Sequence, residues 1–246
     1  MTNKTALIIG GGTGIGAACA LALAQDGFRT AIAGRRMEPL IDVAERHRSL
    51  SGLDAESILC HQVDVADANS VKALFEWALG ELRQIDVLVF SAGINIRQRA
   101  LAELSNADWE NVLQINTSGA FYCLQNVLPA MRARRDGVII LISSVAGIRA
   151  GLLGGAAYNA SKFALSALGI TAALEERNNG IRITNLYPGE VETPILDQRP
   201  DPVSAEQRAR ILQPEDVAAA VRMIVQLPPR AHVSELVIKP TTQAFQ

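Results

Sequence analysis

Short apolar runs alternate along the chain with longer segments in which apolar residues recur every three or four positions. Short apolar runs are typical of buried strands, and the recurrence is typical of helices that bury one face. We therefore predict strands at residues 5–9, 29–33, 57–63, 86–90, 137–143, 181–187 and 235–239. Helices are predicted at residues 17–25, 37–50, 67–82, 158–178 and 214–226, together with a long helix that begins at Ser105 or Asn106 and includes Leu124.

Strands that alternate with helices predict an α/β fold, a doubly wound parallel sheet of about seven strands with helices on both faces. A chain of 246 residues that is 49% hydrophobic can bury a sizeable core. No internal repeat and no Pro- or Ser-rich linker divides the sequence, so we expect a single domain over residues 1–246. Residues 190–213 are rich in Pro, Asp, Arg and Gln, and we interpret them as a mobile loop over a site or as a plain surface loop.

The charged residues nearly balance, with a formal net charge of -2. Because there is no basic surplus, we expect no binding to nucleic acid or to an anionic membrane surface, and no apolar stretch reaches the ~18 residues of a membrane span. Cys19, Cys60 and Cys123 lie far apart and lack His or Cys neighbours at ligand spacing, so we expect neither a disulfide framework nor a metal site. This use of cysteine favours a reducing, cytoplasmic location.

A glycine-rich turn separates the first predicted strand from the first predicted helix. Its sequence, Gly10-Gly-Gly-Thr-Gly14-Ile-Gly16, has the spacing Gly-x-x-x-Gly-x-Gly. Glycine lets the backbone turn tightly and approach a pyrophosphate, and the free N–H groups at a helix start favour its charge. The placement therefore favours a nucleotide site over an ordinary loop. Lys4 and the apolar run after it superficially resemble a signal peptide, but its removal would destroy this turn, so we expect the run to stay in the fold.

The end of the second predicted strand indicates which nucleotide would bind. The strand leads into Gly34-Arg35-Arg36 and carries no acidic residue at its end. An acidic side chain here would bind the ribose hydroxyls of NAD, whereas two arginines can hold the 2′-phosphate of NADP. We therefore favour NADP(H) over NAD(H), with two solvated arginines as the alternative. Asp64 and the turn Ser91-Ala92-Gly93 also follow strands and are candidates for contacts with adenine and ribose.

A tyrosine and a lysine lie one helical turn apart in Tyr158-Asn-Ala-Ser-Lys162. Residues four apart share a helix face, so the Lys162 ammonium is expected to lower the pKa of the Tyr158 phenol and suit it to proton transfer; a solvated helix face is the alternative. Asn116 lies on or beside an apolar helix stripe, so its amide either satisfies backbone groups or belongs to a site. Ser143 and Ser144 stand at the end of the fifth predicted strand.

Taken in order, these motifs resemble those of the short-chain dehydrogenase/reductase family over essentially the whole chain. The matching residues are Gly10, Gly14, Gly16, Asp64, residues 90–93, Asn116, Ser144, Tyr158, Lys162, Pro188, Gly189 and Thr193. The resemblance implies a Rossmann-like fold, with a cofactor half at about 1–135 and a catalytic and substrate half at about 136–246. It also implies cofactor contacts at Gly10, Gly12, Thr13, Gly14, Ile15, Gly16, Arg35, Arg36, Asp64, Val65, Ser91, Ala92, Gly93, Tyr158, Lys162, Pro188, Gly189, Val191 and Thr193.

The sequence also departs from the usual pattern of the family. Ile9 replaces the threonine before the first glycine, and Phe90-Ser91 replaces a pair of asparagines. Ser144 precedes Tyr158 by fourteen residues, one more than is common, so Ser143 is kept as a lesser candidate for the catalytic serine. The carboxyl end, Glu235-Leu-Val-Ile-Lys-Pro240, resembles the branch that acts on NADP-linked 3-hydroxy acids.

By resemblance, Tyr158 is the general acid/base, Lys162 binds the nicotinamide ribose and tunes the tyrosine, Ser144 binds the developing alkoxide, and Asn116 holds a water that links the lysine to solvent. The implied activity is hydride transfer between NADP(H) and a small carbonyl or secondary alcohol substrate, such as a 3-hydroxy acid or a 3-oxoacyl compound, in a homodimer or homotetramer. Arg97 or Arg149 would suit a substrate carboxylate, with surface arginines as the default. The alternative is a non-catalytic NADP-binding regulatory protein.

Overall fold

Seven parallel strands form a single sheet in the computed structural model, which describes residues 4–51 and 56–244. The strand order is β3-β2-β1-β4-β5-β6-β7. In chain order, the strands are β1 (Thr5–Ile9), β2 (Arg29–Gly34), β3 (Leu59–Gln62), β4 (Val87–Phe90), β5 (Gly137–Ile142), β6 (Ile181–Pro188) and β7 (Glu235–Ile238). The predicted α/β fold with a parallel sheet of about seven strands is confirmed.

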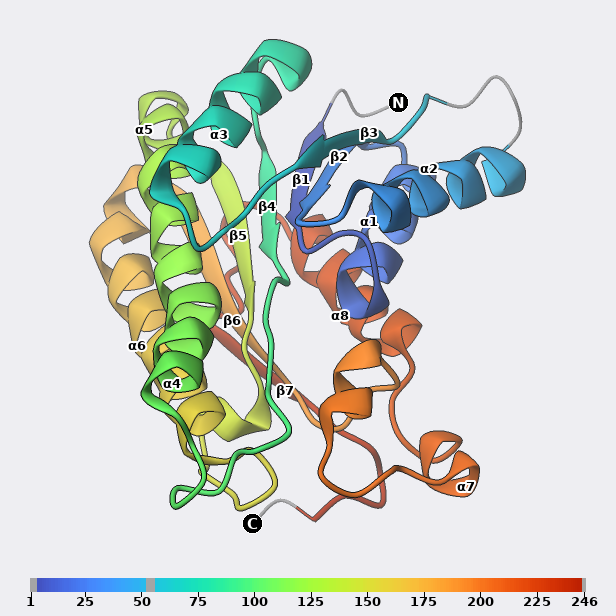
Figure 1. Cartoon of the computed structure of the whole chain (residues 1–246). Helices are drawn as coiled ribbons and strands as arrows, with labels where there is room; N and C mark the ends of the chain where they lie inside the picture. The colour runs from blue at the N-terminus through green and yellow to red at the C-terminus, as the bar shows by residue number, and fades with distance from the viewer. Residues whose placement is uncertain (1–3, 52–55, 245–246) are drawn as a thin grey trace.

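Helices cover both faces of the sheet, as Figure 1 shows. One face packs against α3 (Ala68–Leu82), α5 (Gly119–Arg134) and α6 (Ala156–Glu176), and the other packs against α1 (Gly14–Gln25), α2 (Met37–Ser51) and α8 (Pro214–Gln226). The side chains of β1 point alternately to the two faces of the sheet. Leu7 and Ile9 join the core under α3 and α5, whereas Ala6 and Ile8 join the core under α1 and α8. A strand buried on both faces explains why the sequence of β1 is wholly apolar after Thr5.

The long helix predicted from Ser105 or Asn106 is present, but it is not α-helical throughout, because its centre contains a π-helical turn. Ser105 caps α4 (Asn106–Leu113) by accepting a hydrogen bond from Asp108 N at 3.0 Å. A π-helical turn, Gln114–Ser118, then separates α4 from α5. Such wide turns are rare and occur frequently at functional sites. Here the turn carries Asn116, one of the predicted site residues.

The segment 190–213, predicted as a loop over the site, contains two short helices, η4 (Pro194–Gln198) and α7 (Ala205–Arg208). A backbone bridge between Val191 and Leu212 joins the two ends of the segment. Ion pairs of Arg208 with Glu192 and Asp197 link η4 and α7 from within. The segment is therefore folded, and its mobility stays a prediction.

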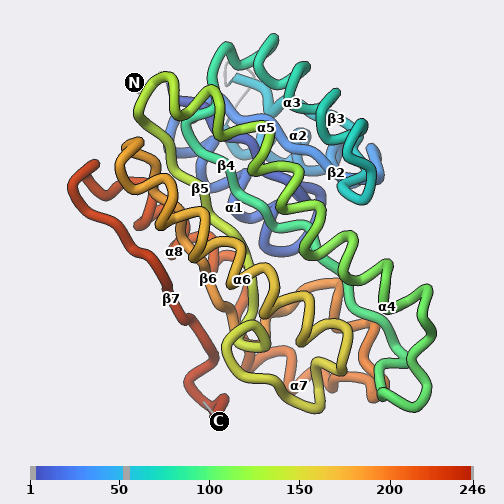
Figure 2. The backbone as a smooth tube through the Cα atoms, turned by 90° about the vertical axis from the view of Figure 1, so that its left-hand side faces the viewer, coloured from blue at the N-terminus to red at the C-terminus, as the bar shows by residue number. Residues whose placement is uncertain are grey.

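Figure 2 views the molecule from the side of α5 and α6, which run beside each other over the sheet. Within the described chain, every helix is too short or too polar to cross a membrane.

Candidate active site

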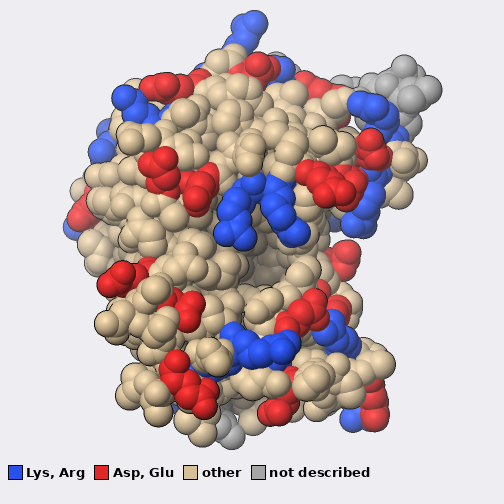
Figure 3. Space-filling view, viewed as in Figure 1, with Lys and Arg blue, Asp and Glu red and all other residues tan. Residues whose placement is uncertain are grey.

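The predicted site residues lie along one edge of the sheet. Because all strands are parallel, β1, β4, β5 and β6 end on the same side, and the chain continues from there into the loops of the site. β1 lies between β2 and β4, so the connections that leave β1 and β4 diverge to opposite sides. Ligands of doubly wound sheets bind in the crevice at this point. In Figure 3 a hollow opens in the middle of this face, with basic side chains beside it.

The glycine-rich turn packs so closely that side chains are excluded at two positions. Gly10 has φ 80°, and a Cβ there would lie 2.6 Å from the backbone nitrogen of Ala92. A Cβ on Gly16 would overlap the carbonyl oxygen of Gly10. Both glycines are therefore needed to bring the start of α1 against the ends of β1 and β4.

The first turn of α1 is suited to an anion. Thr13 is the N-cap, yet its side chain makes no capping hydrogen bond, and no acidic residue lies in the first turn. The N–H groups of that turn are therefore left for a ligand, and the helix dipole favours a negative charge there. Thr193 lies against the same turn, since its Cγ2 would be 2.9 Å from a Cβ on Gly14. This arrangement fits the pyrophosphate of a dinucleotide.

A cavity of about 200 Å³ continues from this turn between the ends of the strands. Its lining includes the predicted residues Gly10, Gly12, Thr13, Arg35, Arg36, Asp64, Val65, Ala92 and Gly93. Arg35 and Arg36 are exposed and lie just before the first residue of α2, so one end of the cavity combines two guanidinium groups with a second helix start. That end suits a phosphate group.

The other predicted contacts do not line this cavity, namely Gly14, Ile15, Gly16, Ser91, Tyr158, Lys162, Pro188, Gly189, Val191 and Thr193. Asp64 also serves the fold, since its Oδ1 accepts a hydrogen bond from Ala66 N at 3.0 Å. Several apolar lining residues were not predicted, namely Ile9, Pro39, Leu40, Val63, Ile94 and Ile115. Their positions directly after strands or beside the glycine and arginine motifs were the available signal.

The two candidate serines at the end of β5 point in different directions. The Ser143 hydroxyl is buried, donates to Lys162 O at 3.2 Å and lies 3.0 Å from Ser166 Oγ inside the fold. The Ser144 side chain instead accepts from Ala146 N at 3.1 Å and lies within hydrogen-bonding reach of the Tyr158 phenol. Ser144 is therefore the serine next to the tyrosine.

Burial raises the pKa of the Tyr158 phenol, while a hydrogen bond with Ser144 and the charge of Arg99 oppose that rise. The prediction that Lys162 lowers this pKa was wrong for the chain by itself, because burial is the largest effect and Arg99 is the cation that counters it. Tuning by Lys162 together with a bound cofactor stays a prediction.

Lys162 and Asn116 meet beneath Gly93. Lys162 is buried, its Nζ donates to Ile142 O at 3.0 Å, and the same nitrogen lies 5.6 Å from the centre of the Tyr158 ring. A Cβ on Gly93 would lie 3.5 Å from Lys162 Nζ and 3.4 Å from Asn116 Oδ1. Burial lowers the pKa of Lys162 to about 8. The structure thus brings the four predicted catalytic residues together, and two of them, Asn116 and Lys162, lie against Gly93 of the cavity wall.

The Asn116 amide is fully satisfied by this arrangement. Its Oδ1 accepts from Ile94 N at 2.8 Å, and its Nδ2 donates to Ile94 O at 2.9 Å and to Ser161 Oγ at 3.0 Å. These bonds fasten the π-helical turn to the loop after β4 and to α6. The first possibility left open for Asn116, that it satisfies backbone groups, is therefore confirmed, and its role in the site stays a prediction.

Comparison with known proteins agrees with this geometry. A family model described as short chain dehydrogenase matches residues 4–203. The chain belongs to the short-chain dehydrogenase/reductase family. It is therefore an oxidoreductase that uses a nicotinamide cofactor, and the predicted family resemblance is confirmed.

Relatives of this short-chain dehydrogenase/reductase differ in substrate and length. Glycine betaine reductase ATRR of Emericella nidulans is 33% identical over 245 residues, which span 98% of this chain and only 19% of that longer protein. An alcohol dehydrogenase from Thermococcus sibiricus, solved with 5-hydroxy-NADP, is 28% identical, with a TM-score of 0.87 and 98% of each chain covered. A closed form of serine dehydrogenase with NADP+ is also 28% identical, with a TM-score of 0.87, and covers 98% of this chain and 96% of its own.

Neither arginine suggested for a substrate carboxylate is the one that acts on Tyr158. Arg97 is exposed and donates to Asp197 O at 3.3 Å, and Arg149 is exposed. Arg99, which the sequence did not single out, is buried, and its charge acts on the phenol. Its place within the cluster Arg97-Gln-Arg99 was the only signal, since nothing local distinguishes a buried arginine from an exposed one.

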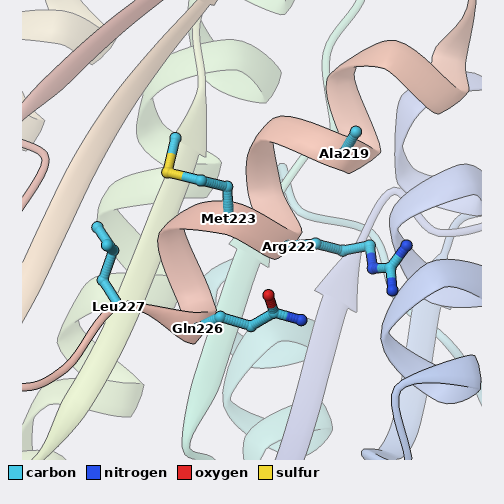
Figure 4. A pocket seen from close by; sticks show the side chains of 5 residues that line it. All are labelled: Ala219, Arg222, Met223, Gln226 and Leu227. Atoms are coloured by element: carbon cyan, nitrogen blue, oxygen red, sulfur yellow. The ribbon is translucent and has the colours of Figure 1, made fainter.

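A second hollow of this short-chain dehydrogenase/reductase lies on the outer side of α8 and is larger, at about 400 Å³. Figure 4 shows its lining, which consists of Ala219, Arg222, Met223, Gln226 and Leu227. Arg222 forms an ion pair with Asp26 at the end of α1. None of the predicted site residues lines this hollow, so it is not part of the candidate active site.

Proposed function

We propose that this protein is an NADP(H)-dependent reductase or dehydrogenase of small carbonyl and secondary alcohol substrates, with Asn116, Ser144, Tyr158 and Lys162 as its catalytic residues. The observation that carries the proposal is the Ser144 hydroxyl next to the Tyr158 phenol, with the buried Lys162 ammonium 5.6 Å from the ring. A phenol, a hydroxyl and a cation together can protonate an oxygen atom and stabilise charge on it.

In the reducing direction, Tyr158 donates its proton to the carbonyl oxygen of the substrate. Ser144 donates a hydrogen bond to the same oxygen, and this contact strengthens as negative charge develops on the oxygen. A bound reduced nicotinamide supplies the hydride that adds to the carbonyl carbon. In the oxidising direction, Tyr158 accepts the hydroxyl proton.

Lys162 suits the return of the proton to Tyr158. Its pKa of about 8 lets it exchange protons near neutral pH, and its nitrogen lies close to Gly93 and Asn116. The amide of Asn116 holds the neighbouring backbone in place rather than moving a proton itself. We propose that a water near Asn116 completes the route from Lys162 to solvent.

The preference for NADP(H) is supported by the two guanidinium groups at the α2 end of the cavity. In that position they would hold the 2′-phosphate, and the cavity wall there includes no carboxylate other than Asp64. The relatives solved with NADP or its derivative are in line with this preference. A small hydroxy acid such as serine is the substrate class that the similarity to serine dehydrogenase favours.

A homodimer or homotetramer is part of the proposal. Large apolar side chains lie exposed on the outer sides of α5 and α6, namely Phe121, Phe163, Ile170 and Leu174. Exposed apolar surface of this kind is typical of an interface with another chain. The molar mass in solution, measured by light scattering, tests this part of the proposal, and a monomer would contradict it.

The test of the proposed function is oxidation of NADPH and of NADH with a panel of ketones, 3-oxo acids, acyl thioesters and sugars, together with reduction of NADP+ by the corresponding alcohols. We expect turnover of at least one carbonyl class with NADPH preferred. Tight binding of NADPH with no turnover of any compound would instead favour a regulatory protein.

A further inference from the structure

Arg99 joins three segments of the chain beside the start of α6. Its Nε donates to Ile96 O at 2.8 Å, and its Nη1 donates to Leu153 O at 2.7 Å. Its Nη2 donates to Gln198 O, the last carbonyl of η4. These carbonyls belong to the loop after β4, to the turn before α6 and to the segment 190–213. A single guanidinium group thus connects three segments that lie far apart in sequence.

The turn that Arg99 contacts leads directly into the helix that carries Tyr158. Gly155 is the N-cap of α6 and has φ 76°, and a Cβ there would lie 2.5 Å from Cβ of Arg99. Asn95 joins the same two loops again, because its Nδ2 donates to Gly154 O at 3.1 Å. Tyr158 is the third residue of α6. A displacement of Arg99 would therefore reach the first turn of α6.

Two buried cations accompany the phenol: the charge of Arg99 acts on it, and Lys162 Nζ lies 5.6 Å from the centre of its ring. Arg99 is 8% exposed and Lys162 is 4% exposed, and within residues 4–51 and 56–244 neither forms an ion pair with a carboxylate. The charge of Arg199 also acts on Arg99, and Arg199 itself is paired with Glu190 at 3.0 Å. Unpaired buried cations lower stability. They become favourable when a negative charge, such as a tyrosinate or an alkoxide, forms near them.

The two cations keep their protons over different ranges of pH. Burial lowers the pKa of Lys162 to about 8, so this ammonium loses its charge at mildly alkaline pH. Burial also lowers the pKa of Arg99, but a guanidinium is by nature a much stronger base than an ammonium group and stays charged where Lys162 does not. Above about pH 8, Arg99 is therefore the cation that favours the ionised form of Tyr158.

We propose that Arg99 is a positioning residue that couples the docking of residues 194–198 to proton transfer at Tyr158. The Gln198 carbonyl holds one end of the guanidinium, so the charge is fixed near the phenol when η4 is docked. This inference rests on the proposed function, because it takes Tyr158 as the residue that moves the proton.

The docking is tested by hydrogen–deuterium exchange of the cofactor-free protein, which requires no turnover. We compare Arg99→Gln and Arg99→Lys with the control Arg97→Gln, which removes an exposed arginine of the same loop that also donates to η4. In Arg99→Gln, exchange in peptides that cover residues 151–155 and 194–198 should rise by about tenfold or more. Arg97→Gln should change it much less. Unchanged exchange in both Arg99 variants overturns the proposal.

The charge effect is tested by the pH dependence of kcat for alcohol oxidation. The kcat for alcohol oxidation is expected to rise with increasing pH as Tyr158 loses its proton. In Arg99→Gln this rise should occur about one pH unit higher, so that kcat near pH 8 falls roughly tenfold while KM changes little. Arg99→Lys should keep the position of the wild-type profile, because the charge is retained. Arg99→Met, which also removes the charge, replaces Arg99→Gln in both measurements if the latter does not fold.

Two outcomes distinguish this inference from a substrate-binding role of Arg99 and from the proposed function itself. An unmoved pH profile with a rise of KM confined to acidic substrates would make Arg99 a substrate-binding residue and overturn the positioning role. A wild-type protein that turns over no substrate would refute the proposed function, whereas the exchange measurement would still decide whether Arg99 docks residues 194–198.

Discussion

Replacement of both Arg35 and Arg36 by alanine tests how the cavity selects its nucleotide. The two residues lie at the junction of β2 and α2 and line the same end of the cavity. If they hold the 2′-phosphate of NADP(H), their removal should weaken NADPH binding and leave NADH binding nearly unchanged, because NADH lacks that phosphate.

The size of the effect follows from the exposure of the two side chains. A charge-assisted hydrogen bond contributes about 1.5–3 kcal/mol, but solvent screens exposed pairs, so each arginine is expected to contribute about 1–1.5 kcal/mol. Both side chains are exposed. The double variant should therefore lose about 2–3 kcal/mol of NADPH binding, which is roughly a 30- to 150-fold increase in Kd.

The assay is titration calorimetry with NADPH and with NADH at low and at high salt. Arg46→Ala is the matched control, because Arg46 is an exposed arginine of α2 that does not line the cavity. The wild-type preference for NADPH should also shrink at high salt, since exposed charge pairs are screened. Equal losses for NADPH and NADH in the double variant would refute the assignment of a phosphate site to these arginines.

Two further predictions concern the serines and the lysine. Ser144→Ala should lower kcat by about 10²–10³-fold, because Ser144 lies next to the phenol. Ser143→Ala should leave kcat within about threefold and cost about 1–3 kcal/mol of stability, because Ser143 hydrogen bonds inside the fold. Steady-state kinetics and urea unfolding measure these effects, and the reverse pattern would exchange the roles of the two serines. The pKa of Lys162 is lowered from 10.5 to about 8 by folding, so the unfolded chain binds more protons than the folded protein between these pH values. The cofactor-free wild type should therefore gain up to about 3 kcal/mol of stability relative to Lys162→Met as the pH rises from 8 to 10. Parallel stability curves for the two proteins would show that Lys162 is not desolvated.

The regular elements could be predicted closely where local chemistry marks their ends. β1 (Thr5–Ile9) and α8 (Pro214–Gln226) have the predicted bounds, because glycines follow the strand directly and a proline fits the first position of the helix. β3 (Leu59–Gln62) is shorter than predicted, since it is an edge strand and only the residues that pair with β2 count as strand. The π-helical turn could not be predicted, because it depends on bonds from Asn116 to Ile94 and Ser161.

The sequence predicted those residues of the candidate site that belong to a recognisable local motif. Strand ends and glycine spacing indicated the cofactor side, and the order of Ser144, Tyr158 and Lys162 indicated the other side. The choice between Ser143 and Ser144 needed the direction of each side chain. Arg99 was missed because two of its three carbonyl partners lie 54 and 99 residues away along the chain, and only the fold brings them together.

The central claim is that Tyr158 transfers the proton in a site that binds NADP(H) independently of that phenol. Tyr158→Phe removes only the hydroxyl group, so the most direct test is to measure its NADPH affinity together with its turnover of a substrate found with the wild type. We predict a Kd for NADPH within about threefold of the wild type and a kcat lower by at least about 100-fold. Near-normal turnover with NADPH still bound would contradict the account.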